Sequence, residues 1–362
     1  MNKLLFIRYK KTTGILEGGE LASQKNYDLL ALLLGSKNIT TYYIHDEAKK
    51  KKLGDYLRGI FYFLRNYYFG LTPARVDEIV LLADAYEFVF VDRSVFGLVA
   101  KRLKESGFKG LVIGFFHNVE EIYFSAKISR FAPWRGLVLR CVNANDSYTA
   151  TYCNKIIALN TRDAQEIKHR YNKSVDMLIP ITFKDRLKEI PSKEELTSTH
   201  PLCLFIGSYF AANTDGILWF IKEVYPNVTI RLKIVGKGMD KMRKDIPKEI
   251  ELVSDAPDIT PFFEEADVII LPIFKGSGMK VKTCESLMFG KNIVGTTEAF
   301  EGYELAYNQV GALCNTKEDF IHALKDISEN PRPKFNAYSR QVYLEKYAEE
   351  TVIDKFKTVL GL

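Results

Sequence analysis

The sequence has few features of secreted, metal-binding or membrane-spanning proteins. Its 362 residues include five cysteines, an odd number, and no CxxC pair, so neither a disulfide framework nor a zinc site is predicted. We expect all five to be reduced core residues: Cys141, Cys153, Cys203, Cys284 and Cys314. No apolar run reaches the ~18 residues that span a bilayer, and the first residues lack the pattern of a secretion signal. These absences predict a cytoplasmic protein.

Disorder and repeats are also absent. The chain is 47% hydrophobic and 27% charged, which is typical of globular proteins, and its length favours two domains over one core. The net charge of +6 comes from the residues up to Lys184, since the remainder is acidic. A basic half can mark a nucleic acid or an anionic membrane as partner, although an ordinary solvated surface explains it too. No nucleic-acid-binding motif is present, so no nucleic acid is predicted as a partner.

Short apolar segments alternate with helical patterns in the N-terminal half. Two helical patterns lie between strands, at Ser94–Ser106 and Asp163–Tyr171. Such alternation predicts a parallel sheet with helices on both faces. The expected strands are Lys3–Arg8, Thr40–Ile44, Phe88–Val91, Gly110–Phe116 and Lys155–Leu159.

The alternation restarts after a polar, proline-containing segment. We expect strands at Leu202–Ile206, Thr229–Val235, Ile250–Val253, Val268–Pro272 and Asn292–Gly295, and helices at Asp215–Val224, Ile259–Ala266, Lys280–Phe289, Lys317–Ser328 (capped by Thr316) and Tyr338–Leu360. The predicted fold class is α/β, with two Rossmann-like doubly wound domains whose strand-end loops face a central cleft. The predicted divisions are 1–183, a linker at 184–200, 201–336, and a C-terminal helix at 337–362 that crosses back to the first domain.

The most informative segment runs from Ala266 to Lys291. A buried strand ends at Pro272, a glycine loop follows, and a helix is expected to begin close to Gly278. Glycines let a ligand approach the backbone, and the amides at a helix N-terminus favour phosphate. Lys280 and Lys282 add positive charge, and Glu285 can accept hydrogen bonds from ribose hydroxyls. The alternative is an ordinary helix start with solvated lysines.

This segment resembles the glycosyltransferase family 4 group of retaining enzymes with the GT-B fold. The resemblance covers Ala266–Pro272, Gly276–Lys282, Glu285–Leu287, Gly290–Thr296 and Glu301-Gly302, and it extends to Phe205–Ser208, Asn213–Asp215, Trp219-Phe220, Val235–Gly238 and Phe116–Glu120. Two departures stand out. Ser277 occupies the position of the family's first glutamate, and Ser208–Asp215 lacks the arginine and lysine that grip the diphosphate in many members.

The resemblance implies roles for particular residues. Lys282, helped by Lys280, would hold the diphosphate, Glu285 the ribose, and the loops near Gly236 and Ser254 the base. His117 matches a cleft histidine near the donor sugar, although a structural histidine at a strand end is the alternative. The implied catalytic residues are His117, Lys282 and Glu285. The implied donor-binding residues are Gly207, Ser208, Gly236, Lys237, Gly238, Ser254, Asp255, Gly276, Ser277, Gly278, Met279, Lys280, Lys282 and Glu285.

The acceptor is expected at the first domain, against Gly18, Gly19, His117 and Asn118. Lys49–Lys52 followed by the aromatic segment Tyr56–Phe69, and the segment Arg130–Arg135, are typical of contact with an anionic membrane. A core helix with a solvated lysine lead-in is the alternative for Tyr56–Phe69.

The function implied is retaining transfer of a hexose-type sugar from a nucleotide diphosphate sugar, UDP favoured over GDP, to a glycan or lipid-linked acceptor. Cell-surface polysaccharide or glycoconjugate synthesis at the inner face of the membrane is the expected setting. No Asp-x-Asp motif follows a strand, so no metal and no cofactor other than the donor is predicted. The alternatives are a sugar-nucleotide 2-epimerase and a non-catalytic GT-B protein that partners a transferase.

Overall fold

The chain divides into two units, Met1–Pro180 with Val352–Leu362, and Ile181–Thr351. A computed structural model describes residues 2–10, 18–45, 53–68, 70–191, 193–276 and 278–362. The predicted membrane lysines 49–52 and Ser277 lie outside the described residues, as do 14–17 of the first glycine loop.

The first unit contains a parallel sheet in the order β2-β1-β3-β4-β5-β6. Its strands are β1 (Leu4–Lys10), β2 (Ile39–His45), β3 (Phe88–Val91), β4 (Leu111–Phe116), β5 (Lys155–Ala158) and β6 (Met177–Leu178). Its helices are α1 (Gly18–Leu34), α2 (Leu53–Leu64), α3 (Pro73–Ala83), α4 (Gly97–Glu105), α5 (Glu120–Lys127), α6 (Arg135–Tyr152) and α7 (Thr161–Tyr171). The strand order reverses between β1 and β3, and the crevice expected at such a switch point lies at the carboxyl ends of these two strands.

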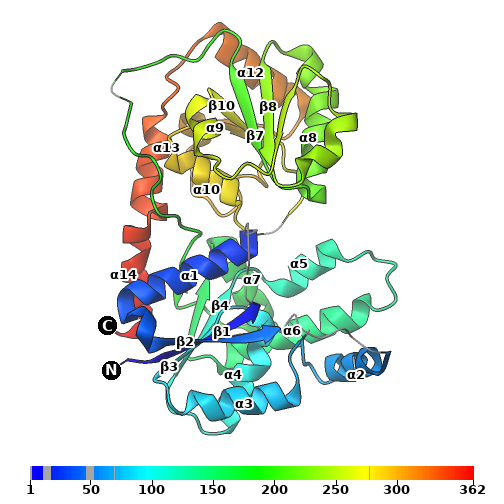
Figure 1. Cartoon of the computed structure of the whole chain (residues 1–362), viewed down its shortest axis with the longest axis vertical. Helices are drawn as coiled ribbons and strands as arrows, with labels where there is room; N and C mark the ends of the chain where they lie inside the picture. The colour runs from blue at the N-terminus through cyan, green and yellow to red at the C-terminus, as the bar shows by residue number, and fades with distance from the viewer. Residues whose placement is uncertain (1, 11–17, 46–52, 69, 192, 277) are drawn as a thin grey trace. The chain divides into compact units, whose positions relative to one another are not determined.

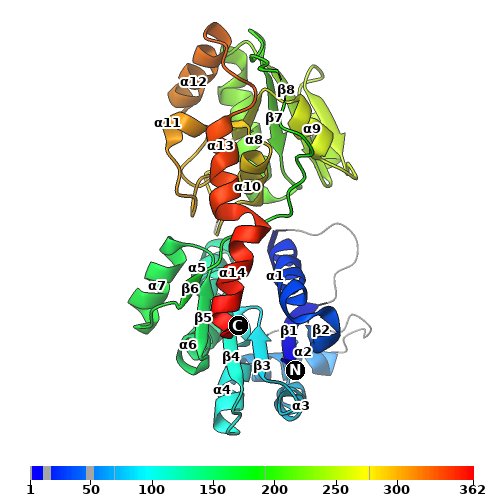
Figure 2. The same cartoon turned by 90° about the vertical axis from the view of Figure 1, so that its left-hand side faces the viewer.

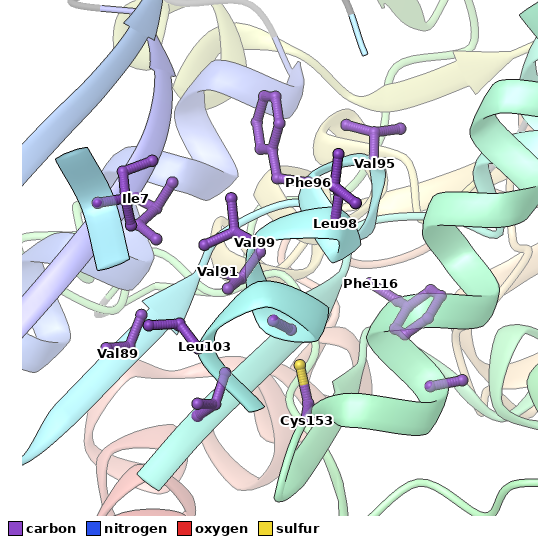
Figure 3. Close-up of a cluster of buried hydrophobic side chains, with 14 of the residues drawn as sticks. Ile7, Val89, Val91, Val95, Phe96, Leu98, Val99, Leu103, Phe116 and Cys153 are labelled. Carbon is purple, nitrogen blue, oxygen red and sulfur yellow. The ribbon is translucent and has the colours of Figure 1, made fainter. Parts of the chain in front are cut away.

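Alternating side chains of the central strands build two cores in this unit. Val89 and Val91 point to the face covered by α3 and α4, where they join Val99 and Leu103 in the cluster of Figure 3. Phe90 points to the opposite face and packs against Phe356, with ring centroids 6.2 Å apart. The alternation explains why these strands are apolar throughout, because both faces of the sheet are buried.

The second unit repeats this architecture in the order β12-β11-β10-β7-β8-β9. Its strands are β7 (Leu202–Ile206), β8 (Arg231–Gly236), β9 (Glu251–Ser254), β10 (Val268–Leu271), β11 (Asn292–Gly295) and β12 (Gly311–Leu313). Its helices are α8 (Ala211–Glu223), α9 (Thr260–Glu265), α10 (Val281–Met288), α11 (Tyr307–Val310), α12 (Lys317–Glu329) and α13 (Ala337–Val342). Here the order reverses between β10 and β7, and the crevice opens between their loops.

Helices cover both faces of the second sheet (Figure 1). On one face Phe220 of α8 meets Phe320 of α12 edge to face, 5.8 Å between ring centroids. On the other, Phe263 of α9 stacks on Phe289, 4.8 Å away at the end of α10. The predicted parallel α/β architecture is therefore confirmed in both units.

The C-terminal helical pattern is interrupted. The predicted helix over 338–360 is present as α13, a π-helical turn at Tyr343–Tyr347, and α14 (Glu349–Leu360). Ala348 between them is extended, with φ −71° and ψ 150°. From Val352 on, α14 lies against the first sheet (Figure 2), and Lys355 donates to the Leu178 carbonyl at 3.2 Å.

The segment predicted as a linker, 184–200, falls in the second unit. Thr197 donates its amide to the Arg332 carbonyl at 2.8 Å, and Asp185 accepts a hydrogen bond from Arg340 at 2.9 Å. These contacts tie the segment to the end of the second unit's chain.

All five cysteines are buried and free, as predicted. Within the described residues, no helix combines the length and the apolar character that crossing a bilayer requires.

Candidate functional site

At the crevice of the second unit, the backbones at the ends of β7 and β8 come into close contact. A Cβ placed on Gly236, at the end of β8, would lie 1.9 Å from the Gly207 carbonyl oxygen. A Cβ on Gly207, after β7, would lie 3.1 Å from Lys282 Nζ. The end of β8 therefore touches the loop after β7 through the main chain, and packing requires a glycine at position 236. At position 207 a side chain would meet the side chains of Asn213 and Lys282.

Lys282 is the cation at this crevice. It stands in the first turn of α10, and its Nζ donates to Asn213 Oδ1 at 2.5 Å, across the β10/β7 switch point. The ammonium also lies 5.0 Å from the centre of the Phe205 ring. Among the described residues it forms no ion pair. Burial, followed by the positive charge of Lys280, lowers the pKa of Lys282 to about 7. An anion at this place would restore the pKa and stabilise the charge.

Lys280 is held differently. Its Nζ pairs with Glu298 at 2.6 Å and also donates to the Gly278 carbonyl at 2.7 Å. The helix predicted at Lys280–Phe289 is α10, which begins one residue later, at Val281. A start close to Gly278 is wrong, because Gly278 has φ +66° and Lys280 is extended. Lys280 therefore has a carboxylate partner of its own, whereas Lys282 does not. That Lys280 helps to hold the diphosphate stays a prediction.

Glu285, the predicted ribose acceptor, is buried on α10 and has a partner that the sequence did not indicate. Arg186 Nη2 donates to Glu285 Oε1 at 2.6 Å. Burial raises the pKa of the Glu285 carboxyl, while the Arg186 guanidinium and then Lys282 act to lower it. Arg186 comes from the segment 184–200, so this segment contributes a charged side chain to the crevice.

The loops after β8 and β9 are tied together by polar contacts. The Gly238 amide donates to Asp255 Oδ1 at 3.3 Å, and Ser254 Oγ donates to Asp240 Oδ1 at 2.9 Å. Gly238 and Asp255 both have positive φ, +69° and +55°. The predicted base-binding residues therefore lie side by side, next to the loop after β7. Of the other predicted donor residues, Ser208 accepts from Asn213, Met279 is buried, and Lys237 and Gly276 are in neighbouring loops.

The crevice of the first unit is built from buried acidic and polar groups. Asp92 follows β3, and its carboxylate accepts hydrogen bonds from Ser23 Oγ and, at 3.1 Å, from Asn26 Nδ2, both on α1. His117 follows β4, is 3% exposed, and places Nε2 3.4 Å from Asp92 Oδ1. His117, predicted as a cleft residue, therefore lies at the strand-end edge of this sheet, beside the β1/β3 switch point.

A second buried carboxyl, Glu120, lies close to His117, and a third, Asp146, lies close to Glu120. Burial raises the pKa of Glu120, and Arg93 and His117 oppose this shift. Burial, followed by the charge of Glu120, raises the pKa of Asp146 well above its usual range. A Cβ on Gly19 would lie 2.9 Å from Arg93 Nη2, which places this predicted acceptor residue at the same edge. Gly18 begins α1, and Asn118 follows His117 and is half-buried.

Sequence reasoning missed the partners of the predicted residues. Arg186, Glu298 and Asp92 are each separated from their partner by a long stretch of chain, and no local spacing pattern links them. Asp92 carried one signal, because it directly follows a predicted buried strand, as His117 does.

A cavity of about 320 Å³ lies beside α8, and its lining contains none of the predicted site residues. It is lined by Ala212, Asp215, Gly216, Trp219, Phe274, Lys275 and Asn315. In the described part of the chain, no group of three or more His, Cys, Asp or Glu side chains is arranged to hold a metal ion.

Comparison with known proteins supports this description. Residues 200–330 match the family profile described as Glycosyl transferases group 1. Among solved structures, the chain is similar to HepE from Anabaena in complex with UDP and glucose (13% identity, 100% of both chains, TM-score 0.68). It is also similar to sucrose-phosphate synthase from Thermosynechococcus elongatus (11% identity, 99% of this chain and 98% of that chain, TM-score 0.74). A third similar structure is the lipopolysaccharide outer core galactosyltransferase WaaB (12% identity, 99% of both chains, TM-score 0.62).

A search of curated protein sequences found no match. At these identities the solved structures establish the fold, and the profile match concerns the second unit. The chain has the GT-B fold, and its residues 200–330 belong to the glycosyl transferases group 1 family.

Proposed function

We propose that this protein is a retaining glycosyltransferase that moves a hexose-type sugar from a nucleotide diphosphate sugar to a glycan or lipid-linked acceptor. UDP is favoured over GDP as the donor nucleotide, since HepE, which has the same fold, was crystallised with UDP and with UDP-glucose. The cellular process would be the synthesis of a surface polysaccharide or glycoconjugate.

The observation that carries the proposal is Lys282. It is a partly buried cation without a carboxylate partner among the described residues, and it points across the switch point toward Gly207. Close-packed glycine loops, the amides that begin α10 and one unpaired cation form a site for a diphosphate. Glu285, one turn along α10, is placed for a ribose hydroxyl.

The same groups would act in the reaction. When the bond between sugar and diphosphate breaks, negative charge develops on the leaving oxygen, and Lys282 with the α10 amides would stabilise it. This stabilisation needs no metal ion at the diphosphate, and we propose a metal-independent reaction. The acceptor hydroxyl would be met by the crevice of the first unit, at Gly18, Gly19, His117 and Asn118.

Exposed apolar side chains support membrane contact by the first unit. Phe131 and Trp134 are 89% and 54% exposed on the turn before α6, between Arg130 and Arg135. Ile60, Phe61 and Leu64 are exposed on α2, which packs against α6. Amphipathic surfaces with flanking arginines favour an anionic membrane, which would place the protein at the inner face of the membrane. Co-sedimentation with phosphatidylglycerol vesicles, reduced by Phe131→Ser with Trp134→Ser, would test this.

Calorimetric titration with UDP, GDP, ADP, TDP and CMP, with and without magnesium, tests the donor proposal. Binding of one nucleoside diphosphate without magnesium supports it, and acceptor-dependent release of that diphosphate from its sugar supports transfer. If no nucleotide binds, the proposal is wrong and a non-catalytic role is favoured. Interconversion of the donor sugar without an acceptor would instead indicate a 2-epimerase.

A further inference from the structure

The Asp92 carboxylate faces the Nε2 atom of the buried His117 imidazole. The imidazole is buried between the carboxylate on one side and the Phe115 ring, whose centre is 4.9 Å away. The pair joins the ends of two neighbouring strands, β3 and β4, so the backbone positions of both residues are fixed by the sheet. The imidazole therefore has little freedom to turn within this site.

The surroundings of Asp92 decide where the proton on His117 sits. Its carboxylate accepts from Ser23 Oγ and from Asn26 Nδ2, so it acts as an acceptor on every side that the structure describes. An acceptor that faces Nε2 favours the tautomer with the proton on Nε2. In this tautomer the Nδ1 atom carries a lone pair and accepts a hydrogen bond.

Nδ1 has no such hydrogen bond within the described residues. It is buried and has no partner there. A buried polar atom left unpaired is costly, and the few that persist in folded proteins call for an explanation such as a function. Besides Asp92, the ionisable group that interacts with the ring is Glu120, and Arg93 and Asp146 in turn interact with Glu120. None of them forms a hydrogen bond with Nδ1.

We infer that Asp92 is a positioning residue that holds His117 with its proton on Nε2, so that Nδ1 accepts a hydrogen bond from a hydroxyl group of the saccharide. The inference rests on the proposed function for the identity of the ligand. It assigns to Asp92, Ser23 and Asn26 a role in setting the tautomer, which no local spacing pattern predicts. A saccharide hydroxyl suits this atom, since it brings a donor to an acceptor that otherwise has none.

The tautomer can be measured without any ligand. The full-length protein is labelled with ¹⁵N-histidine, and long-range ¹H–¹⁵N correlation spectra are recorded above the pH at which the histidines titrate. His117→Gln identifies its signals among the five histidines. We expect the pattern of an Nε2-protonated ring. A ring protonated at Nδ1 in the unmodified protein would overturn the inference, whether or not any variant folds.

Asp92→Asn gives the second readout, because an amide can donate to Nε2 and so favour the opposite tautomer. We expect the Nδ1-protonated pattern to appear and kcat/KM for transfer to fall about tenfold, the size of one lost hydrogen bond. Affinity for UDP should not change. Asp77→Asn is the matched control, since Asp77 is an exposed carboxylate of the same unit that pairs with Arg102, and it should alter neither readout.

An Asp92→Asn protein with unchanged tautomer and unchanged transfer would also overturn the inference. The proposed function fails in a different way. If the protein binds no nucleotide and transfers no sugar while the spectra show the Nε2-protonated ring, the tautomer assignment stands and only the saccharide as ligand is refuted.

Discussion

The two crevices occupy equivalent places in two sheets of the same design, yet their chemistry is opposite. In the second unit the loops meet through glycine backbone, and the side chain at the switch point is the cation Lys282. In the first unit the corresponding edge holds buried acidic groups: Asp92 and Glu120 lie close to His117, and Asp146 lies close to Glu120. One edge is suited to an anion that lies against the main chain, and the other to hydroxyl groups that donate to side chains.

The comparison teaches that the strand order determines the position of a ligand site in the sheet. The first residues after each strand determine which kind of ligand the site suits. Parallel doubly wound sheets bind at the switch point regardless of ligand. Under the proposed function, glycine after β7 and β8 would admit a phosphate, whereas aspartate after β3 and histidine after β4 would not. The predictions that follow test each half of this contrast, from the largest expected effect to the smallest.

Removing the cation should abolish the anion site. For Lys282→Met we expect the Kd for UDP to rise about 100-fold, the weight of a hydrogen bond to a charged group in a partly buried site. Lys275→Met, an exposed lysine of the neighbouring loop, is the matched control and should bind UDP normally. Equal loss in both variants, or loss in neither, would contradict the assignment of Lys282.

The same variant should be more stable than the unmodified protein when no ligand is bound. The pKa of Lys282 is lowered from 10.5 to about 7, so between these values the unfolded chain binds more protons and the free energy of unfolding rises with pH. The free energy of unfolding that Lys282→Met gains over the unmodified protein should therefore be largest below pH 7 and shrink toward pH 10.5. Thermal unfolding over this range measures it.

Closing the glycine contact should disrupt the second crevice through packing alone. In Gly236→Ala the new methyl group would lie 1.9 Å from the Gly207 carbonyl oxygen, and overpacking of this kind costs ~1–3 kcal/mol. Gly136→Ala is the control, because Gly136 is in a helix and has open space around it. That substitution should be neutral or stabilise by up to ~1 kcal/mol. Urea unfolding with UDP titration compares the two.

Affinity for the donor should depend on pH through the charge of Lys282. UDP-glucose is the suitable probe, since its diphosphate does not titrate near neutral pH. Above the Lys282 pKa of about 7 we expect its Kd to rise by up to tenfold per pH unit, because binding must restore the proton. Lys282→Arg keeps its charge at every pH tested and should show a flat profile. A sloping profile in this variant would point to another group.

The smallest effect is expected from the partner of Glu285. Arg186→Gln removes the cation that offsets the burial of this carboxyl, so the pKa of Glu285 should rise further and its ribose contact weaken. We expect a loss of about fivefold in UDP affinity, the size of one hydrogen bond. Lys188→Gln, an exposed lysine in the same segment, should leave the affinity unchanged.

The sequence predicted the strands well, since a strand buried on both faces is a continuous apolar run. Asn292–Gly295 was predicted with its observed bounds. The two shortest strands, β6 and β12, were missed, because two or three residues carry no periodicity. The interruption at Ala348 was missed too, since the apolar spacing continues across it.

The sequence predicted only part of the site, and the reason differs from that for the strands. Lys282, Glu285 and the glycines are close in sequence or follow predicted strands, so local pattern and family resemblance were enough to select them. Arg186 is 99 residues from Glu285, and Asp92 is 25 residues from His117. Such partners meet only after the sheets have formed, and a single sequence contains no spacing rule that pairs them.

The Arg186–Glu285 pair has a consequence for dissecting or recombining the protein. The matched family region begins at residue 200, and a fragment or chimera cut there would present Glu285 without its guanidinium. It would also lose the Tyr343 hydroxyl bond to the Phe183 carbonyl, 2.7 Å long. Domain exchanges meant to change donor choice should therefore be joined before Ile181, so that the transplanted nucleotide site carries its own counter-charge.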